Sequence, residues 1–234
     1  MNVSSPGIVA LPTPPGLDIA LWLVDLDADA NHWDTTVLHA SEQDRAARFR
    51  FDVHARRYRA SHVALRQILG HATGLDPASL VFTEGTHGKP RLVHAGAPQF
   101  NMSHSAGWAL IGVCPDHPIG IDIEIVTPMD DAEVLAQRNF SATEYAAFAH
   151  TPPDQQLEAF FRCWTRKEAC LKALGSGLSI EPGEFEAGLG QLEQGTFIAV
   201  DGQPCRMRVG CIGLPIAGLA AYARLDDAHS PLAM

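Results

Sequence analysis

The pattern of hydrophobic and polar positions is most regular over residues 119–125, where isoleucine alternates with Gly120, Asp122 and Glu124. Successive side chains of a strand point to opposite faces, so this pattern predicts a strand with one apolar and one acidic face. Two carboxylates on one face repel each other unless water or a cation lies between them. The acidic face is therefore either the wet side of an amphipathic strand or half of a site for a hard metal ion.

Apolar residues recur at helical spacing over two long segments, residues 52–69 and residues 154–174. Glycines mark where these helices end, at Gly70 and Gly74 for the first and at Gly175 for the second. Shorter segments with a strand-like pattern follow each long helix, among them residues 80–83, 99–103, 108–113, 184–189 and 206–211. A long helix followed by a small sheet thus occurs twice.

This repetition predicts an α+β fold with two pseudo-symmetric halves, each a long helix packed on a small, mainly antiparallel sheet. Residues 1–16 are rich in proline, serine and glycine and are expected to form a flexible arm. The N-terminal half then spans residues 17–117, and the C-terminal half spans residues 118–234.

Glu168 stands out in the second long helix because it lies at the edge of an apolar stripe, four residues after Trp164 and three before Leu171. A half-buried carboxylate needs a partner. One interpretation is an ion pair with Lys172 at i,i+4, worth about 0.2–0.5 kcal/mol. The other is that Glu168 faces the acidic strand and adds a third oxygen ligand, with Lys172 one turn further along the same face.

Charge and cysteine content narrow the class of protein. The net charge of −10 argues against general nucleic-acid binding. Seven of the 17 basic residues lie between Arg45 and Arg66, which indicates either a solvated helix face or a patch for phosphates or an acidic partner. The five cysteines show no disulfide or zinc spacing. No apolar run reaches the roughly 20 residues of a membrane span, so we expect a cytoplasmic protein with no membrane partner.

Two short segments supply candidate anion ligands. The strand-like residues 99–103 run into a loop that presents Ser103 and His104. The His104 ring could bond a phosphate oxygen, although a loop histidine bonded to backbone is the commoner arrangement. Lys89 stands on a tight Gly88-Lys89-Pro90 turn, where its ammonium can reach an anion as a point charge.

The order and spacing of these motifs resemble those of the phosphopantetheinyl transferases, in particular the large, monomeric type that activates surfactin synthetase. The resemblance runs from Arg45 to Phe185. It is carried by Gly88-Lys89-Pro90, by Phe-Asn-Met-Ser-His-Ser at residues 100–105, by Gly-Ile-Asp-Ile-Glu at residues 120–124, by Trp-x-x-Lys-Glu-Ala at residues 164–169, and by Lys172 with Gly-x-Gly-Leu-Ser at residues 175–179.

The resemblance implies transfer of the 4′-phosphopantetheine arm of coenzyme A to a serine hydroxyl of an acyl or peptidyl carrier protein, with release of adenosine 3′,5′-bisphosphate. It also implies a monomer whose two halves hold coenzyme A between them. Mg²⁺ is the expected metal cofactor, because it takes oxygen ligands and shares carboxylates with substrate phosphates. The alternative is a metal-dependent hydrolase of coenzyme A or a related pyrophosphate, with water in place of the serine.

Carried over by position, the resemblance assigns a role to each candidate residue. Asp122, Glu124 and Glu168 would hold Mg²⁺, Ser103, His104 and Lys89 would contact the phosphates, Arg45 would bind the 3′-phosphate, and Glu168 or Lys172 would be the catalytic base. Two positions depart from the family pattern: Glu42 stands where some relatives carry a second basic residue, and Tyr58 replaces a small hydroxyl residue. These departures affect the expected nucleotide contacts and leave the expected reaction unchanged.

Overall fold

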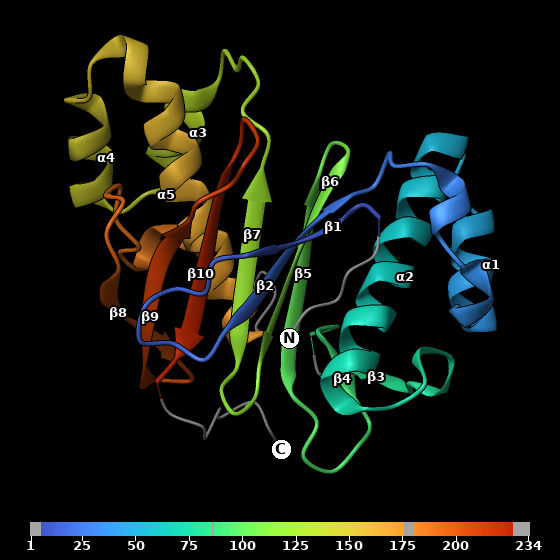
Figure 1. The fold of residues 1–234 in the computed structure, drawn as a ribbon. Coiled ribbons are helices and arrows are strands. Elements are labelled where there is room, and N and C mark those ends of the chain that lie inside the picture. The colour runs from blue at the N-terminus through green and yellow to red at the C-terminus, as the bar shows by residue number, and fades with distance from the viewer. Residues whose placement is uncertain (1–5, 86, 176–179, 227–234) are drawn as a thin grey trace.

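The computed structural model describes residues 6–85, 87–175 and 180–226. Within these ranges the chain forms two four-stranded antiparallel sheets, with strand orders β1-β2-β6-β5 and β7-β10-β9-β8, and a small β3-β4 hairpin (Figure 1). The strands are β1 (Ile8–Leu11), β2 (Ala20–Asp25), β3 (Phe82–Glu84), β4 (Pro90–Leu92), β5 (Gln99–Ser105), β6 (Trp108–Cys114), β7 (Ile119–Glu124), β8 (Gln194–Val200), β9 (Gln203–Ile212) and β10 (Leu219–Leu225).

Helices cover each sheet, and their arrangement confirms the predicted α+β fold with two similar halves. Figure 1 shows α1 and α2 beside the first sheet and α3, α4 and α5 beside the second. The two sheets share a pairing pattern: β2 pairs with β6, which pairs with β5, and β7 pairs with β10, which pairs with β9. The helices are α1 (Ala40–Ala47), α2 (Asp52–Thr73), α3 (Ala132–Asn139), α4 (Ala142–Ala149) and α5 (Pro153–Leu174).

The two long helices end for the same physical reason. Each has 22 residues and stops at a glycine in the left-handed conformation, Gly74 at φ 72° and Gly175 at φ 68°. That conformation costs glycine nothing and lets its N–H bond back to the last turn of the helix. The sequence placed the second end correctly and ended the first helix a turn too early.

The apolar face of β7 is confirmed as core. Ile119, Ile121 and Ile123 are fully buried between the two sheets, where they pack with Leu21 and Leu110 of the first sheet. The other face of β7 lies against α5. A Cβ at position 120 would overlap the Ala169 carbonyl and the Ala173 amide of α5, so only glycine permits this close approach.

The expected flexible arm over residues 1–16 is wrong for part of its length. Ile8–Leu11 forms β1, which pairs with β2 at the edge of the first sheet. Ile8 and Leu11 are buried, and the paired backbone groups hold the strand in place. Three of the four prolines that suggested an arm come after this strand. The division between residues 117 and 118 stays a prediction, although neither four-stranded sheet uses strands from both sides of it.

The strand expected over residues 184–189 is not formed. The Glu144 carboxylate accepts bonds from the backbone amides of Ala187, at 2.7 Å, and of Gly188, at 2.8 Å. The buried Arg166 guanidinium donates to the Ala187 carbonyl at 2.6 Å. Side chains thus satisfy the backbone groups that a neighbouring strand would otherwise take. None of the helices in the described ranges combines the length and the apolar character needed to cross a bilayer.

Candidate active site at the seam between the sheets

Strands β5 and β7 are the facing edges of the two sheets and have no backbone ladder between them. Alternate side chains of β5 make the connection instead. Asn101 Oδ1 accepts from the Ile121 amide at 2.9 Å, Ser103 Oγ donates to Asp122 Oδ1 at 2.8 Å, and Ser105 Oγ donates to Glu124 Oε2 at 2.7 Å. The two carboxylates predicted on the acidic face of β7 therefore lie in this seam.

Asp122 is held at the seam by a lysine from α5. Lys172 Nζ lies 2.5 Å from Asp122 Oδ1 and 2.9 Å from Ser103 Oγ. The Asp122 side chain is buried, and its Oδ2 atom has no hydrogen-bond partner in the described part of the chain. Burial raises the pKa of Asp122, against the opposing effects of Lys172 and Ser103. The ion pair of Lys172 is thus with β7 and not with Glu168 of its own helix.

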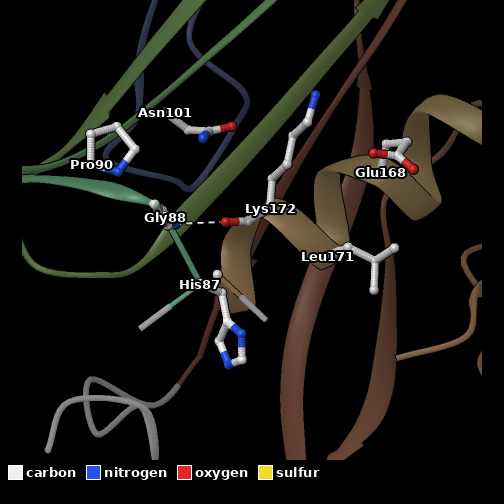
Figure 2. Close-up of a pocket in the computed structure, with 9 residues that line it drawn as sticks. His87, Gly88, Pro90, Asn101, Glu168, Leu171 and Lys172 are labelled. Atoms are coloured by element: carbon white, nitrogen blue, oxygen red, sulfur yellow. Dashed lines mark hydrogen bonds between the residues drawn. The ribbon is translucent and has the colours of Figure 1, made fainter. Parts of the chain in front are cut away.

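Glu168 and Glu124 complete an acidic group around Lys172. Burial raises the pKa of both carboxyls, and the charge of Asp122 raises them further. Glu168 forms no hydrogen bond or ion pair with another residue in the described ranges, and Figure 2 shows it one turn of α5 away from Lys172. In those ranges no three His, Cys, Asp or Glu side chains are close enough together to hold a metal ion. The predicted metal set Asp122, Glu124 and Glu168 therefore stays a prediction.

A cavity of about 280 Å³ opens between α5 and the β3-β4 hairpin (Figure 2). Glu168 and Lys172 line one side of it, and Asn101 and Pro90 line the other. Lys89 is also in its wall, but its Nζ is turned inward. It donates to three backbone carbonyls: Ile119 at 2.8 Å, Lys172 at 2.7 Å and Ala173 at 3.1 Å.

Lys89 thus ties the hairpin of the first half to the end of α5 and the start of β7. Burial lowers the pKa of Lys89 to about 7, while three carbonyl acceptors, two of them at the C-terminus of α5, favour its ammonium form. All three of its donors are used within the protein. A phosphate contact, as the resemblance implies, would have to replace one of these bonds.

A larger cavity of about 520 Å³ adjoins the first and shares Gly88, Pro90 and Asn101 with it. Its wall comes from α1, α2 and β5 and includes the predicted 3′-phosphate ligand Arg45. The Tyr58 and His62 rings stack there, with centroids 3.9 Å apart, and the Arg45 guanidinium lies over the Tyr58 ring. The unusual acidic residue Glu42 also lines this cavity.

Glu42 is not a free charge in the cavity wall. Its Oε2 atom lies 2.8 Å from the buried Arg66 guanidinium and accepts from the His39 amide, also at 2.8 Å. Another charge of the basic stretch between residues 45 and 66 is also neutralised within the protein, because Arg57 forms an ion pair with Asp27. Arg45 has no such carboxylate partner in the described ranges, so its charge is available to a ligand.

The remaining predicted phosphate ligands lie on opposite faces of β5. Ser103 faces the seam, where its hydroxyl is used by Asp122 and Lys172. His104 is exposed and shares its face with Phe100, which packs in the core under α2. Strand alternation therefore separates two residues that the sequence had placed together at one loop tip.

A third cavity of about 300 Å³ lies at the Glu124 end of the acidic strand, against an earlier part of α5 than the first cavity. Its wall is mainly apolar and aromatic, with Phe160, Phe161 and Trp164 contributed by α5. Ser105 and Glu124 form its polar end. The acidic group thus borders two cavities, the 280 Å³ cavity at Glu168 and the apolar cavity at Glu124.

Sequence reasoning missed two sets of residues, one at this site and one in the core of the second half. Asn101 and Ser105 join the two sheets, and their signal was the alternation of polar residues at positions 101, 103 and 105. The second set is the buried ion pair of Glu144 with Lys167, whose Nζ lies 2.6 Å from Glu144 Oε2. Nothing in the spacing of these two residues showed that they meet.

Comparison with known proteins identifies the family. The N-terminal model of the 4′-phosphopantetheinyl transferases matches residues 28–116, and the 4′-phosphopantetheinyl transferase superfamily model matches residues 118–208. The 4′-phosphopantetheinyl transferase HetI of Nostoc sp. is 39% identical over 179 residues, which cover 72% of this chain and 76% of HetI. The 4′-phosphopantetheinyl transferase psf-1 of Bacillus pumilus is 37% identical, with 68% of each chain covered.

The enzyme Sfp of Bacillus subtilis, also named a 4′-phosphopantetheinyl transferase, is 29% identical over 184 residues and covers 78% of this chain and 81% of its own. Among solved structures, a Thermotoga maritima holo-[acyl-carrier-protein] synthase matches 47% of this chain and 63% of its own, with 22% identity and a TM-score of 0.32. The resemblance inferred from the motifs is confirmed by the sequence matches. The chain belongs to the 4′-phosphopantetheinyl transferase superfamily.

Proposed function

We propose that this protein transfers the 4′-phosphopantetheine arm of coenzyme A to a serine hydroxyl of an acyl or peptidyl carrier protein. The observation that carries the proposal is the acidic seam with Lys172 at its centre: the cavity that Lys172 lines adjoins the 520 Å³ cavity, and an apolar cavity begins at Glu124. A ligand with phosphates in the middle and different groups at its two ends suits this arrangement. Coenzyme A has that form.

The 520 Å³ cavity is the proposed nucleotide site. Its volume falls within the roughly 300–1,000 Å³ typical of small-molecule sites. The stacked rings of Tyr58 and His62 offer an apolar surface for a base, and Arg45 offers a charge for the 3′-phosphate. His104, Lys89 and Ser103 remain proposed phosphate contacts. Of these three, the His104 ring is the one with no hydrogen bond to another described residue.

The chemical step is a displacement at phosphorus. The serine Oγ forms a bond to the phosphorus that carries the pantetheine arm, and the bond from that phosphorus to the bridging oxygen breaks. Adenosine 3′,5′-bisphosphate leaves with the bonding electrons, and the serine proton passes to a base. Such a reaction needs mainly positioning and electrostatic stabilisation from the protein.

Glu168 is the proposed base. A carboxylate whose pKa is raised by burial accepts a proton more readily than an exposed one. Lys172 donates to Asp122 and Ser103, so in this arrangement it serves as a cation beside the phosphates. We therefore assign the role of base to Glu168 and an assisting electrostatic role to Lys172.

Mg²⁺ is part of the proposal because the residues present fit it. Asp122 Oδ2 is buried without a partner in the described ranges, and burial raises the pKa of Asp122, Glu124 and Glu168 alike. A hard cation with oxygen ligands would relieve both conditions, with these three side chains holding it. When bound, Mg²⁺ would neutralise negative charge that develops on the leaving bisphosphate.

The carrier protein is proposed to approach from the 300 Å³ cavity, because the 520 Å³ cavity proposed for the nucleotide is a separate one. We further propose a cytoplasmic monomer. The free thiols of Cys114, Cys163, Cys170 and Cys211 support a reducing compartment. The two similar halves within one chain support a monomer, since each supplies one side of the seam.

Incubation with coenzyme A, Mg²⁺ and an apo carrier protein tests the proposal by intact mass spectrometry. One carrier serine should gain the mass of the phosphopantetheine arm, with one bisphosphate released per arm transferred. The absence of this mass shift with fatty-acid, polyketide and peptide-synthetase carriers would refute it. Bisphosphate release at the same rate without any carrier would indicate the hydrolase instead.

A further inference from the structure

We propose that Ser105 is a positioning residue that holds Glu124 and joins the first half of the protein to the acidic strand. The proposal rests on the proposed function, since Glu124 is one of the three carboxylates assigned to the reaction. Ser105 Oγ donates to Glu124 Oε2 at 2.7 Å and accepts from the Ile125 amide at 3.1 Å.

The direction of these two bonds is fixed by their chemistry. A backbone amide can only donate, so the Ser105 oxygen accepts from Ile125. The single hydroxyl proton is then free for Glu124, whose carboxylate can only accept. Ser105 therefore favours the charged form of Glu124 and one orientation of its side chain. A residue without a hydroxyl cannot do either.

Ser105 occupies a special place among the contacts of the seam. The edge of β7 that faces the first half is bonded by Lys89 at the Ile119 carbonyl and by Asn101 at the Ile121 amide, and Ser105 bonds the Ile125 amide directly after the strand. Ser103 bonds an acidic side chain of β7 without bonding its backbone. Among the described residues, Ser105 is the one that binds both a carboxylate and the backbone edge of this strand.

The turn that follows Ser105 contacts other residues of the first half. These contacts fix the position of Ser105 independently of β7. The Leu26 amide donates to the Gly107 carbonyl at 2.8 Å. Ala106 adopts φ 50°, and a Cβ at Gly107 would lie 2.5 Å from Asp27 Oδ2. Asp27 is in turn bound by Arg57 of α2.

This chain of contacts runs from α2 through the turn to Ser105 and from there to Glu124. Glu124 also lines the apolar cavity, so Ser105 holds one oxygen of a carboxylate that borders this cavity. Ser105 does not line the 520 Å³ nucleotide cavity. Its loss should therefore affect turnover and leave the binding of coenzyme A largely unchanged.

The test compares Ser105→Ala with Ser105→Thr, which keeps the hydroxyl, and with Ser79→Ala. Ser79 is an exposed serine whose hydroxyl bonds the Asp76 carbonyl at 2.7 Å. Loss of a residue that orients a reacting or ligating group typically costs about 10–100-fold in activity or metal affinity. We expect this loss in kcat for Ser105→Ala, with KM for coenzyme A within about twofold and a higher Mg²⁺ concentration for half-maximal rate.

Ser105→Thr should recover most of kcat, and Ser79→Ala should match the wild type. Amide hydrogen exchange gives a readout that does not depend on turnover. The Ile125 amide should exchange at least about tenfold faster in Ser105→Ala, while the Ile121 amide, held by Asn101, should keep its rate.

An unchanged kcat, or a loss shared equally by Ser105→Thr, would overturn the proposal while the wild-type enzyme still transfers the arm. If the wild type transfers no arm, the proposed function fails. The exchange rates of Ile125 and Ile121 then still decide whether Ser105 joins the two strands. Equal exchange of Ile125 in wild type and Ser105→Ala would overturn that part independently.

Discussion

Replacing Lys167 by methionine should destabilise the protein strongly, because it leaves a buried carboxylate without its countercharge. Lys167 is 1% exposed and Glu144 is 3% exposed, and Nζ lies 2.6 Å from Oε2. Removing one partner of a buried ion pair typically costs about 3–5 kcal/mol. The change also leaves the Pro182 and Phe185 carbonyls without the donor that now binds them at 2.7 and 2.6 Å.

Urea unfolding, followed by tryptophan fluorescence, measures this loss. A cost of about 3–5 kcal/mol is a large part of the about 5–15 kcal/mol that stabilises a typical domain. The matched control is Glu158→Gln, which breaks an i,i+4 ion pair with Arg162 in the same helix. Glu158 is 54% exposed, so this change should cost less than about 1 kcal/mol.

The double variant Glu144→Gln/Lys167→Met should lose less stability than the sum of the two single variants, because no unpaired charge then remains. A loss for Lys167→Met that is no larger than for Glu158→Gln would refute the reasoning. So would a double variant whose loss equals the sum, because the two residues would then act independently.

The same pair predicts a pH dependence with a definite sign. Burial opposes the charge of Glu144, but the bonds from Lys167, Gly188 and Ser141 outweigh it and lower the pKa of the carboxyl. A carboxyl whose pKa is lower in the folded than in the unfolded state stabilises the protein at pH values above its unfolded-state pKa of about 4.3. This stabilisation is lost as the pH falls through the folded-state pKa. Lys167→Met should therefore reduce the dependence of stability on pH in the acid range, measured by the same unfolding experiment between pH 3 and pH 7.

Three further substitutions test the site. Asp122→Asn should lower kcat for transfer by at least about 100-fold. The unfolding midpoint should change little, since Lys172 is partly exposed and water can hydrate its ammonium. Retained activity would show that Asp122 takes no part in the reaction. Arg45→Ala should raise KM for coenzyme A by about tenfold at similar kcat, as expected for the loss of one charge-assisted bond to a phosphate; an unchanged KM would refute the 3′-phosphate contact. Gly120→Ala should prevent folding, because its Cβ would overlap the Ala169 carbonyl; a soluble, cooperatively unfolding variant would show that β7 and α5 can separate.

The position of the acidic strand could be predicted from the sequence because it depends on local alternation. Period 2 over residues 119–125 requires that the isoleucines share one face and that Asp122 and Glu124 share the other. The end of α5 at Gly175 follows from local geometry in the same way. The family motifs also lie within short stretches of chain, so they could be recognised without any tertiary contact.

Pairing across the seam could not be predicted in this way. The sequence left open whether Lys172 pairs with Glu168 of its own helix or lies beside the acidic strand. In the structure it binds Asp122, 50 residues away in sequence. This pairing depends on the contact between β7 and α5 at Gly120, which brings their backbones together. The spacing of Glu168 and Lys172 within one helix contains no information about that contact.

The sequence by itself determined which face of the acidic strand is apolar, where the second long helix ends and which family the chain belongs to. Tertiary structure alone decided which polar groups meet: Ser105 with Glu124, Lys89 with the end of α5, and Glu144 with Lys167. The physical reason is that periodicity sets the direction of a side chain relative to its own backbone. Its partner is set by how closely another backbone, distant in sequence, can approach.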